Sequence, residues 1–323
     1  MKALLSVLCL LWAQEAGAQS LDLRTYQEPA GALTVTLGGD TVDPYFALRA
    51  LLTAQRHGLD IAATAHAWIA WLLPRQKADG SFARYCRTPG SAWQACAPAD
   101  ADDVLAAMWP DLLSLAAPCR SLPPAWRASA RRSLAHLAQL RDRQRGTFRI
   151  SAAQPTSLLM DNIEIHASLQ ALETRCGAAL GAIPSAAQLA VAIQRVFRPV
   201  ASQAYLVSTQ ILPAPAFYPD QVAQVYPMLF GLRNGADASG AMQAWLAEHG
   251  DTWLARTADH YPWGMVALAA SRTGATAPVL RWLDNAAPLR HGVHWNILEE
   301  AAFQSLCVRY RAIAVPCQGE QLP

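Results

Sequence analysis

The sequence predicts an all-α protein built from repeated helical hairpins, and three observations support this. Four aspartates recur every 59 residues, and each opens an apolar stretch of helical length: Asp43, Asp102, Asp161 and Asp220. A fixed period of this size marks a chain of repeated supersecondary units. Few segments have the sequence pattern of a β-strand, and the best candidate, residues 34–39, is expected to lie outside the helical body. Glycines and prolines fall between the helical stretches rather than inside most of them.

Taken in order along the chain, the apolar stretches and their breaks define eleven helices. They are placed at 44–57, 61–73, 102–116, 124–139, 161–174, 186–198, 220–232, 239–249, 262–271, 276–285 and 296–309. Pro110 and Pro227 fall inside two of them and are expected to kink those helices.

The connections between the helices alternate in length. They are short within a pair, as at 58–60 and 272–275, and long between pairs, as at 74–101, 140–160 and 199–219. Short links produce antiparallel hairpins, so all the long loops emerge at one end of the molecule. Loops of this length are usually functional. The same end carries the N-termini of the first helix of each pair, and it is therefore the predicted functional face.

A second repeat follows two of the hairpins. Gln76 to Phe82 and Gln144 to Phe148 both contain a Gly-x-Phe element, in which glycine permits a tight turn and the ring fills the gap between hairpins. With Trp71-Leu72 before it, the first copy is similar to the Gln–Trp motif of α/α toroids. Over residues 44–309 the chain resembles the six-hairpin, or (α/α)6, toroid of many glycosidases, some polysaccharide lyases and the terpene cyclases. Eleven helices leave one outer position unfilled, so a less complete closure is expected.

Composition narrows the class of protein further. Residues 1–18 carry Lys2, an apolar run and a small-residue triplet, which is typical of a cleaved secretory signal, and residues 19–323 are expected to form one toroid domain. A net charge of +2 gives no reason to expect nucleic acid or an acidic membrane surface as a partner. We expect a secreted or periplasmic monomer without a transmembrane segment.

Cysteine content agrees with export. One of the seven cysteines leaves with the signal, and an even number in an exported chain favours disulfides. Six cysteines allow 15 pairings. The preferred set, of which the first and last pairs close short loops, is Cys86–Cys96, Cys119–Cys176 and Cys307–Cys317. Their spacing is not that of a zinc site, so neither a metal nor another cofactor is expected.

The helix starts supply the candidate site. Acids, amides and aromatic rings are what a sugar-binding cleft requires, because carboxylates perform acid–base chemistry and rings stack on pyranose faces. The predicted substrate-binding residues are Asp43, Tyr45, Asn162, Tyr218, Tyr261, Trp263 and Trp295.

Two acidic clusters exceed what helix capping needs. Asp102 and Asp103 follow Asp100 at one helix start, and Asp161 and Glu164 share one face of another helix. Glycoside hydrolysis requires one protonated and one ionised carboxyl group. The predicted catalytic pair takes one residue from each cluster, with Asp220 in reserve. For any single aspartate, a plain N-cap is an equally good explanation.

The stretch 160–172 resembles the Asp-Asn-x-Glu helix starts of six-hairpin carbohydrate enzymes, so the first hypothesis is a hydrolase of a polysaccharide or oligosaccharide. Three alternatives stay open. A lyase on a uronic-acid polymer would recruit Tyr218, His260 and Arg84, and a non-catalytic toroid would only bind glycans. Residues 100–103 also spell the Asp-x-Asp-Asp motif of class II terpene cyclases, but export and disulfides weigh against that hypothesis.

Overall fold

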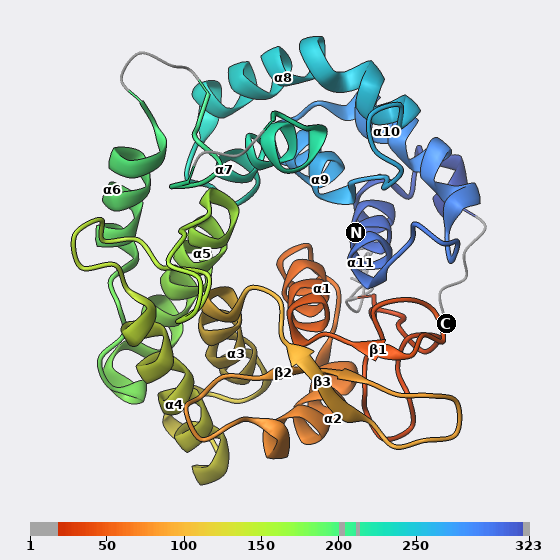
Figure 1. Cartoon of the computed structure of the whole chain (residues 1–323). Helices are drawn as coiled ribbons and strands as arrows, with labels where there is room; N and C mark the ends of the chain where they lie inside the picture. Colours follow the sequence, from red (N-terminus) through yellow and green to blue (C-terminus); the bar gives the residue numbers. More distant parts are fainter. Residues whose placement is uncertain (1–18, 200–203, 211–213, 319–323) are drawn as a thin grey trace, which may run out of the picture.

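The computed structural model describes residues 19–199, 204–210 and 214–318, so the predicted signal at 1–18 lies outside the described residues. Within these ranges eleven α-helices form two concentric rings (Figure 1). The inner ring contains α1 (Pro44–Arg56), α3 (Asp102–Ala116), α5 (Leu159–Cys176), α7 (Tyr226–Leu229), α9 (Gly264–Arg272) and α11 (Ile297–Tyr310). The outer ring contains α2 (Ala62–Leu72), α4 (Pro124–Leu140), α6 (Ala186–Phe197), α8 (Gly235–Ala255) and α10 (Thr276–Ala286). The predicted (α/α)6 toroid is confirmed.

The two rings differ in how much of each helix is buried. In α3 every residue from Asp103 to Ser114 is buried, and in α9 every residue from Gly264 to Ser271. In α6 and α10 only one stripe is buried, as expected for helices with one face in water. Helices that are buried on nearly all sides therefore occupy the inside, and helices with one exposed face surround them.

The inner ring is closed although one outer helix is missing. Each inner helix packs against the next, and α11 packs against α1. At the outer position between α2 and α11, the extended N-terminal segment takes the place of a helix. Gln304 of α11 accepts a hydrogen bond from the backbone of Asp22 and donates one back, and Gln27 donates to Thr64 of α2. The segment buries Leu21, Leu23 and Tyr26.

The strand prediction is wrong in position. Residues 34–39 form a turn, and the strands are β1 (Thr41–Val42), β2 (Ala83–Cys86) and β3 (Gln94–Pro98), which pair antiparallel in that order. Strands this short show no alternating pattern, and tertiary contacts hold them together instead. The Cys86–Cys96 disulfide joins β2 to β3.

The predicted helix at 220–232 is interrupted. It divides into a π-helical turn at Phe217–Gln221 and the short α7, with Pro227 in the first turn of α7. Proline has no N–H group and disfavours a helical conformation for the residue before it, so the helix restarts there. Five 3₁₀ turns complete the described part of the chain: Leu73–Arg75, Cys119–Ser121, Gly177–Leu180, Ala287–Leu289 and Val315–Cys317.

The Gln–Trp-like motif joins neighbouring hairpins. The side-chain amide of Gln76 donates to the carbonyl of Gly80 and to the hydroxyl of Ser133 in α4. Phe82 is buried edge-on against Trp109 of α3, with ring centroids 5.4 Å apart. These contacts connect neighbouring hairpins, as was predicted for the glycine and the ring.

All three predicted disulfides are present: Cys86–Cys96, Cys119–Cys176 and Cys307–Cys317. In the part of the chain that the structure describes, no helix has the length and apolarity required to cross a membrane.

Candidate active site

A cavity of about 350 Å³ opens where the inner helices begin, which is the end predicted to be functional. Its wall is rich in aromatic rings and carboxyl groups. It is lined by Val35, Thr36, Tyr45, Phe46, Asp100, Tyr218, Tyr226, Asp259, Tyr261, Trp263, Met265, Val293, Trp295, Asn296, Leu298 and Glu299. None of these described residues is a lysine or an arginine.

Two rings form a platform at the cavity mouth. Tyr218 and Trp263 stack in parallel with centroids 4.7 Å apart, and Tyr218 is 47% exposed. Tyr261 lies beside Trp263 at 6.1 Å and is also exposed. Exposed flat rings beside carboxyl groups suit the apolar faces and hydroxyl edges of a sugar.

Glu299 contributes a buried carboxyl group to the cavity. The Asn296 side chain caps α11 by accepting hydrogen bonds from the N–H groups of Leu298 and Glu299, which places Glu299 in the first turn. Its Oε2 accepts the N–H of Gly264 at 2.7 Å. A Cβ at Gly264 would lie 2.8 Å from this oxygen, so only glycine permits the contact. Burial raises the pKa of Glu299 to about 7, although the N–H groups of Gly264 and Trp263 oppose the rise.

Asp161 lies on α5, across the ring from α11. Burial raises the pKa of its carboxyl group well above the ordinary value, and the nearby charges of Glu164 and Asp100 add to the rise. Its charge acts on Tyr218, whose pKa burial and Asp161 raise to about 12. Asp161 therefore lies close to two residues of the cavity wall, Tyr218 and Asp100, and its burial favours the protonated form of its carboxyl group.

Asp103 lies behind Asp161 and is fully buried. Burial and the neighbouring Asp161 raise the pKa of Asp103 well above its usual range. Neither Asp103 nor Asp161 is among the described residues that line the cavity.

Glu164 is part of an ion pair in the centre of the ring. Its Oε1 lies 3.0 Å from Nη2 of Arg49, and both side chains are buried. The Tyr45 hydroxyl donates to the same oxygen at 3.4 Å. The predicted Tyr45 thus reaches the cavity, whereas Glu164 supports it from below.

Two predicted catalytic residues lie elsewhere. Asp102 points outward and its Oδ2 is 2.7 Å from Nε2 of His136 on α4. Asp220 accepts the N–H of Ala216 at 2.8 Å and lines a separate surface hollow beside Tyr205. Neighbouring residues of one helix start point in different directions, so the three acids at 100–103 do not converge, and the terpene-cyclase motif has no structural counterpart.

Three predicted binding residues hold the scaffold instead. Asp43 accepts from the Tyr45 N–H, from Arg84 at 2.7 Å and from the Asp100 N–H. Asn162 is fully buried, with its amide bonded to the Phe148 backbone and to the Leu158 carbonyl.

Trp295 is the third predicted binding residue that holds the scaffold. It lines the cavity but is 1% exposed, and its indole N–H donates to Glu300 at 2.9 Å. Its ring is therefore not available as a stacking platform. Arg84, proposed for a lyase, is held by Asp43, and His260 stacks on His294 outside the cavity wall.

Four titratable residues that line the cavity were not among the predicted site residues: Asp100, Tyr226, Asp259 and Glu299. Glu299 had a sequence signal, because the Asn-x-x-Glu spacing at the start of the last inner helix matches a capped helix with an acid in its first turn. Within the described residues, no group of three His, Cys, Asp or Glu side chains is arranged to hold a metal ion.

The sequence matches no protein-family model and none of the curated proteins with which it was compared. Solved structures share its fold. The GH63 mannosylglycerate hydrolase of Thermus thermophilus, in complex with glucose, superposes with a TM-score of 0.54 at 13% identity, over 88% of this chain and 97% of that chain.

Two further structures agree. An α-amylase of Clostridium perfringens has a TM-score of 0.57 at 11% identity, over 87% of this chain and 94% of that chain. A glycosidase variant in complex with glucose has a TM-score of 0.54 at 19% identity, over 90% and 89%. At these identities the likeness concerns the fold, and this chain has the fold of toroid glycosidases over nearly its whole length.

Proposed function

We propose that the protein is a glycoside hydrolase that acts on an uncharged polysaccharide or oligosaccharide at the acidic cavity. The observation that carries the proposal is the buried carboxyl group of Glu299, with its raised pKa, in the wall of an aromatic cavity, with the buried Asp161 on the opposite inner helix next to the wall residue Tyr218. The fold shared with glycosidases supports it.

The environments of the two carboxyl groups suggest different roles. Asp161, whose pKa burial raises well above its usual value, suits the general acid that protonates the leaving oxygen. Glu299, with a pKa of about 7 and a backbone N–H on its Oε2, suits the general base. Different environments of two carboxyl groups are what assign acid and base roles.

We further propose that the reaction inverts the anomeric centre, because the two acids belong to helices on opposite sides of the ring. The helices α5 and α11 are separated by two inner helices in either direction around the ring. Inverting enzymes need about 6.5–9.5 Å between the two carboxyl groups for the attacking water molecule. Proton NMR of the first released product is expected to show the anomer opposite to that of the substrate bond. Retention would contradict the role of Glu299 as base.

The charge of the cavity wall argues for an uncharged substrate over a uronic acid, because no described residue of the wall is a cation that would neutralise a sugar carboxylate. We also propose that the protein is exported to the periplasm or the medium and acts as a monomer. Its three disulfides are consistent with an oxidising compartment.

The test is reducing-sugar release from neutral and uronic-acid polysaccharides and oligosaccharides, with ultraviolet absorbance of unsaturated products followed in parallel. We expect hydrolysis of a neutral substrate without new absorbance. Asp161→Asn and Glu299→Gln should each lower kcat by about 100-fold or more, the typical contribution of general acid–base groups.

Matched controls exist on the outer helix α8. Glu248 and Asp251 are exposed there, so Glu248→Gln and Asp251→Asn change the same groups away from the cavity and should retain full activity. Rising absorbance would indicate a lyase. Binding of a glycan that survives in both cavity variants, without turnover in the wild type, would favour a non-catalytic toroid.

A further inference from the structure

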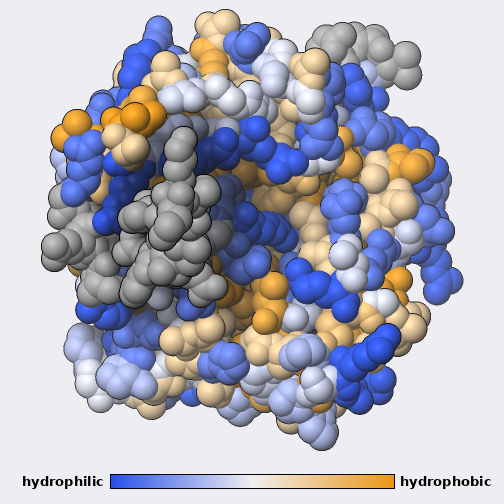
Figure 2. All heavy atoms as spheres, turned by 180° about the vertical axis from the view of Figure 1, so that it is seen from behind, coloured by the Kyte–Doolittle hydropathy of each residue, from blue (hydrophilic) through white to orange (hydrophobic). Residues whose placement is uncertain are grey.

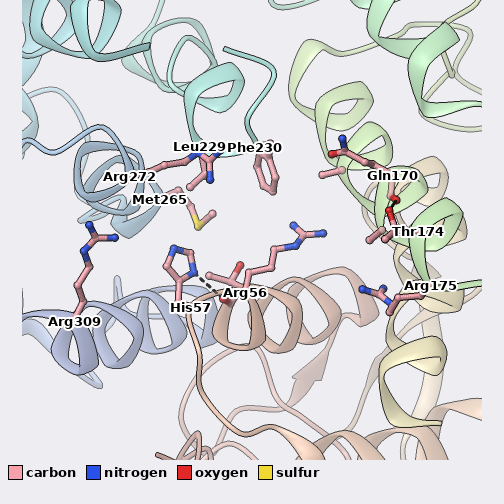
Figure 3. A pocket seen from close by; sticks show the side chains of 13 residues that line it. Arg56, His57, Gln170, Thr174, Arg175, Leu229, Phe230, Met265, Arg272 and Arg309 are labelled. Atoms are coloured by element: carbon pink, nitrogen blue, oxygen red, sulfur yellow. Dashed lines mark hydrogen bonds between the residues drawn. The ribbon is translucent and has the colours of Figure 1, made fainter. Parts of the chain in front are cut away.

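A second, larger cavity of about 660 Å³ opens at the opposite end of the ring, where the inner helices end. Four inner helices each contribute an arginine from the last turn: Arg56 from α1, Arg175 from α5, Arg272 from α9 and Arg309 from α11. His57 follows Arg56 in the same wall (Figure 3). No described residue that lines this cavity is an aspartate or a glutamate.

The positive charges are only partly neutralised. Arg56 and Arg175 share the buried carboxylate of Asp111, which lies behind the wall. Arg272 donates to a side-chain amide oxygen, and among the described residues no carboxylate pairs with Arg272 or Arg309. Figure 3 shows Arg272 and Arg309 on one side of the cavity and Arg175 on the other, with Arg56 and His57 between them.

A basic residue in the last turn of a helix has an ordinary explanation, because the helix C-terminus carries roughly half a negative charge. Four helix ends and Asp111 together supply roughly three negative charges against four guanidinium groups. About one positive charge is left over inside a recess, and a helix-capping role alone leaves it without a counterion.

The rest of the wall suits a small polar ligand. Thr53, Gln170 and Thr174 offer hydroxyl and amide groups, and Phe230 and Met265 form apolar surface. Seen from this end, the molecule is hollowed near its centre with hydrophilic residues inside the hollow (Figure 2). A recess of this kind admits a compact group rather than a flat membrane surface.

The surroundings of His57 show the same excess of positive charge. Its Nδ1 lies 2.9 Å from the Thr53 carbonyl. Burial lowers its pKa, and the charges of Arg56, Arg309 and Arg272 lower it further. Three arginines from three helices therefore act on one point of the wall, where an anion would be attracted and would change the environment of the imidazole.

We propose that this arginine cavity binds a small oxyanion, a phosphate, sulfate or carboxylate group, held by the guanidinium groups of Arg56, Arg272 and Arg309. Guanidinium groups present paired N–H donors that match the oxygens of such anions. The helix α1 separates its residues Tyr45 and Arg56 by about 17 Å at 1.5 Å per residue, so the site is distinct from the acidic cavity and does not depend on its function.

The test is isothermal titration of the full-length protein at low salt with sodium phosphate, sodium sulfate and glucuronate in separate arms, and with neutral glucose for comparison. We expect at least one of the three anions to bind, glucose not to bind at this site, and the affinity to fall as salt is added. The Arg272→Gln/Arg309→Gln variant should bind the anion at least about tenfold more weakly. Both residues are exposed, so the variant should fold, which its circular dichroism spectrum and melting temperature will verify.

Arg281→Gln is the matched control, since Arg281 is an exposed arginine of the outer helix α10 and its loss removes one charge elsewhere. It should leave the affinity unchanged. In ¹H–¹³C NMR spectra, the anion should shift the His57 ring signals, identified by their absence in His57→Gln. The proposal is overturned if none of the anions binds, or if control and double variant weaken binding equally.

Discussion

The buried carboxyl groups of this protein differ in what their oxygen atoms contact, and that difference separates the two proposed catalytic groups from acids that hold the scaffold. Glu164 faces Arg49, and Asp43 receives Arg84 and two backbone N–H groups. Asp161 has no arginine among the neighbours that shift its pKa, and Glu299 has only backbone N–H groups and a distant acid. A buried acid without a cation holds its proton to a higher pH, which is the property that acid–base catalysis uses.

The pKa of Glu299 predicts the acidic side of the activity profile. A base must be ionised, so kcat/KM should rise as pH increases through about 7. The measurement is kcat/KM from about pH 5 to about pH 9 on a substrate that the screen of polysaccharides and oligosaccharides identifies. An acidic limb centred near about pH 4 to 5, as for an exposed glutamate, would contradict the assignment of Glu299.

The contact between His136 and Asp102 predicts a pH-dependent contribution to stability. The hydrogen bond with Asp102 raises the pKa of His136 above its unfolded value, although burial opposes the rise. The contribution is therefore fully present below about pH 6.5 and is lost as pH rises through the higher pKa of the folded state. His136→Gln retains a neutral donor, and should reduce the free energy of unfolding by roughly 1–2 kcal/mol at about pH 5.5 and by less at about pH 8.5.

Urea unfolding at the two pH values measures this difference. His66→Gln, at an exposed position of α2, is the control and should show no pH-dependent change relative to the wild type. An equal loss at both pH values for His136→Gln would mean that the proton on His136 does not contribute.

At the scale of the elements, the connector after α2 depends on one glycine. Gly80 has φ of +98°, and a Cβ there would lie 2.4 Å from the carbonyl oxygen of Arg132 in α4. Gly80→Ala should therefore cost both the left-handed backbone conformation, about 1–2 kcal/mol, and the displacement of α4. We expect a total loss of about 3 kcal/mol or more in the free energy of unfolding.

Gly90 is the matched control for this prediction. Its φ of +81° imposes the same backbone strain, but no atom lies within 4 Å of the position of a Cβ. Gly90→Ala should therefore lose only the part of the free energy of unfolding that comes from the backbone conformation. Guanidinium titration of both variants measures the two losses. Similar losses for both variants would show that contact with α4 does not make Gly80 necessary.

At the scale of the whole molecule, the disulfides stabilise the ring to different extents. Cys119–Cys176 links cysteines 57 residues apart, whereas the other two close separations of 10. Loop entropy predicts about 4 kcal/mol for the long loop and about 3 kcal/mol for a short one. We expect the double variant Cys119→Ser/Cys176→Ser to be the less stable one. It should unfold at a lower guanidinium concentration than Cys86→Ser/Cys96→Ser. The reverse order would show that loop length does not decide these contributions.

Much of this fold could be predicted because the sequence features that specify it involve residues close together in the chain. Helical periodicity, the caps at Asp43 and Asn296 and the Gly-x-Phe connectors depend on residues within one or two turns of one another. They determined most of the helices, the alternation of inner and outer helices, and the end at which aromatic and acidic side chains gather. The broken helix at 220–232 and the short strands escaped prediction because long-range packing, not periodicity, decides them.

A ring of helical hairpins, its disulfides and a mouth rich in acids could be predicted from the residues alone, because repeats, periodicity and spacing are properties of the chain. Which acids lie at the cavity depends on tertiary packing. The rotation of α3 about its axis turns Asp102 outward to His136, and ring closure brings Glu299, from the last inner helix, into the cavity wall. Neither direction nor closure is encoded in the neighbours of these residues, since both arise from packing between helices that are distant in sequence.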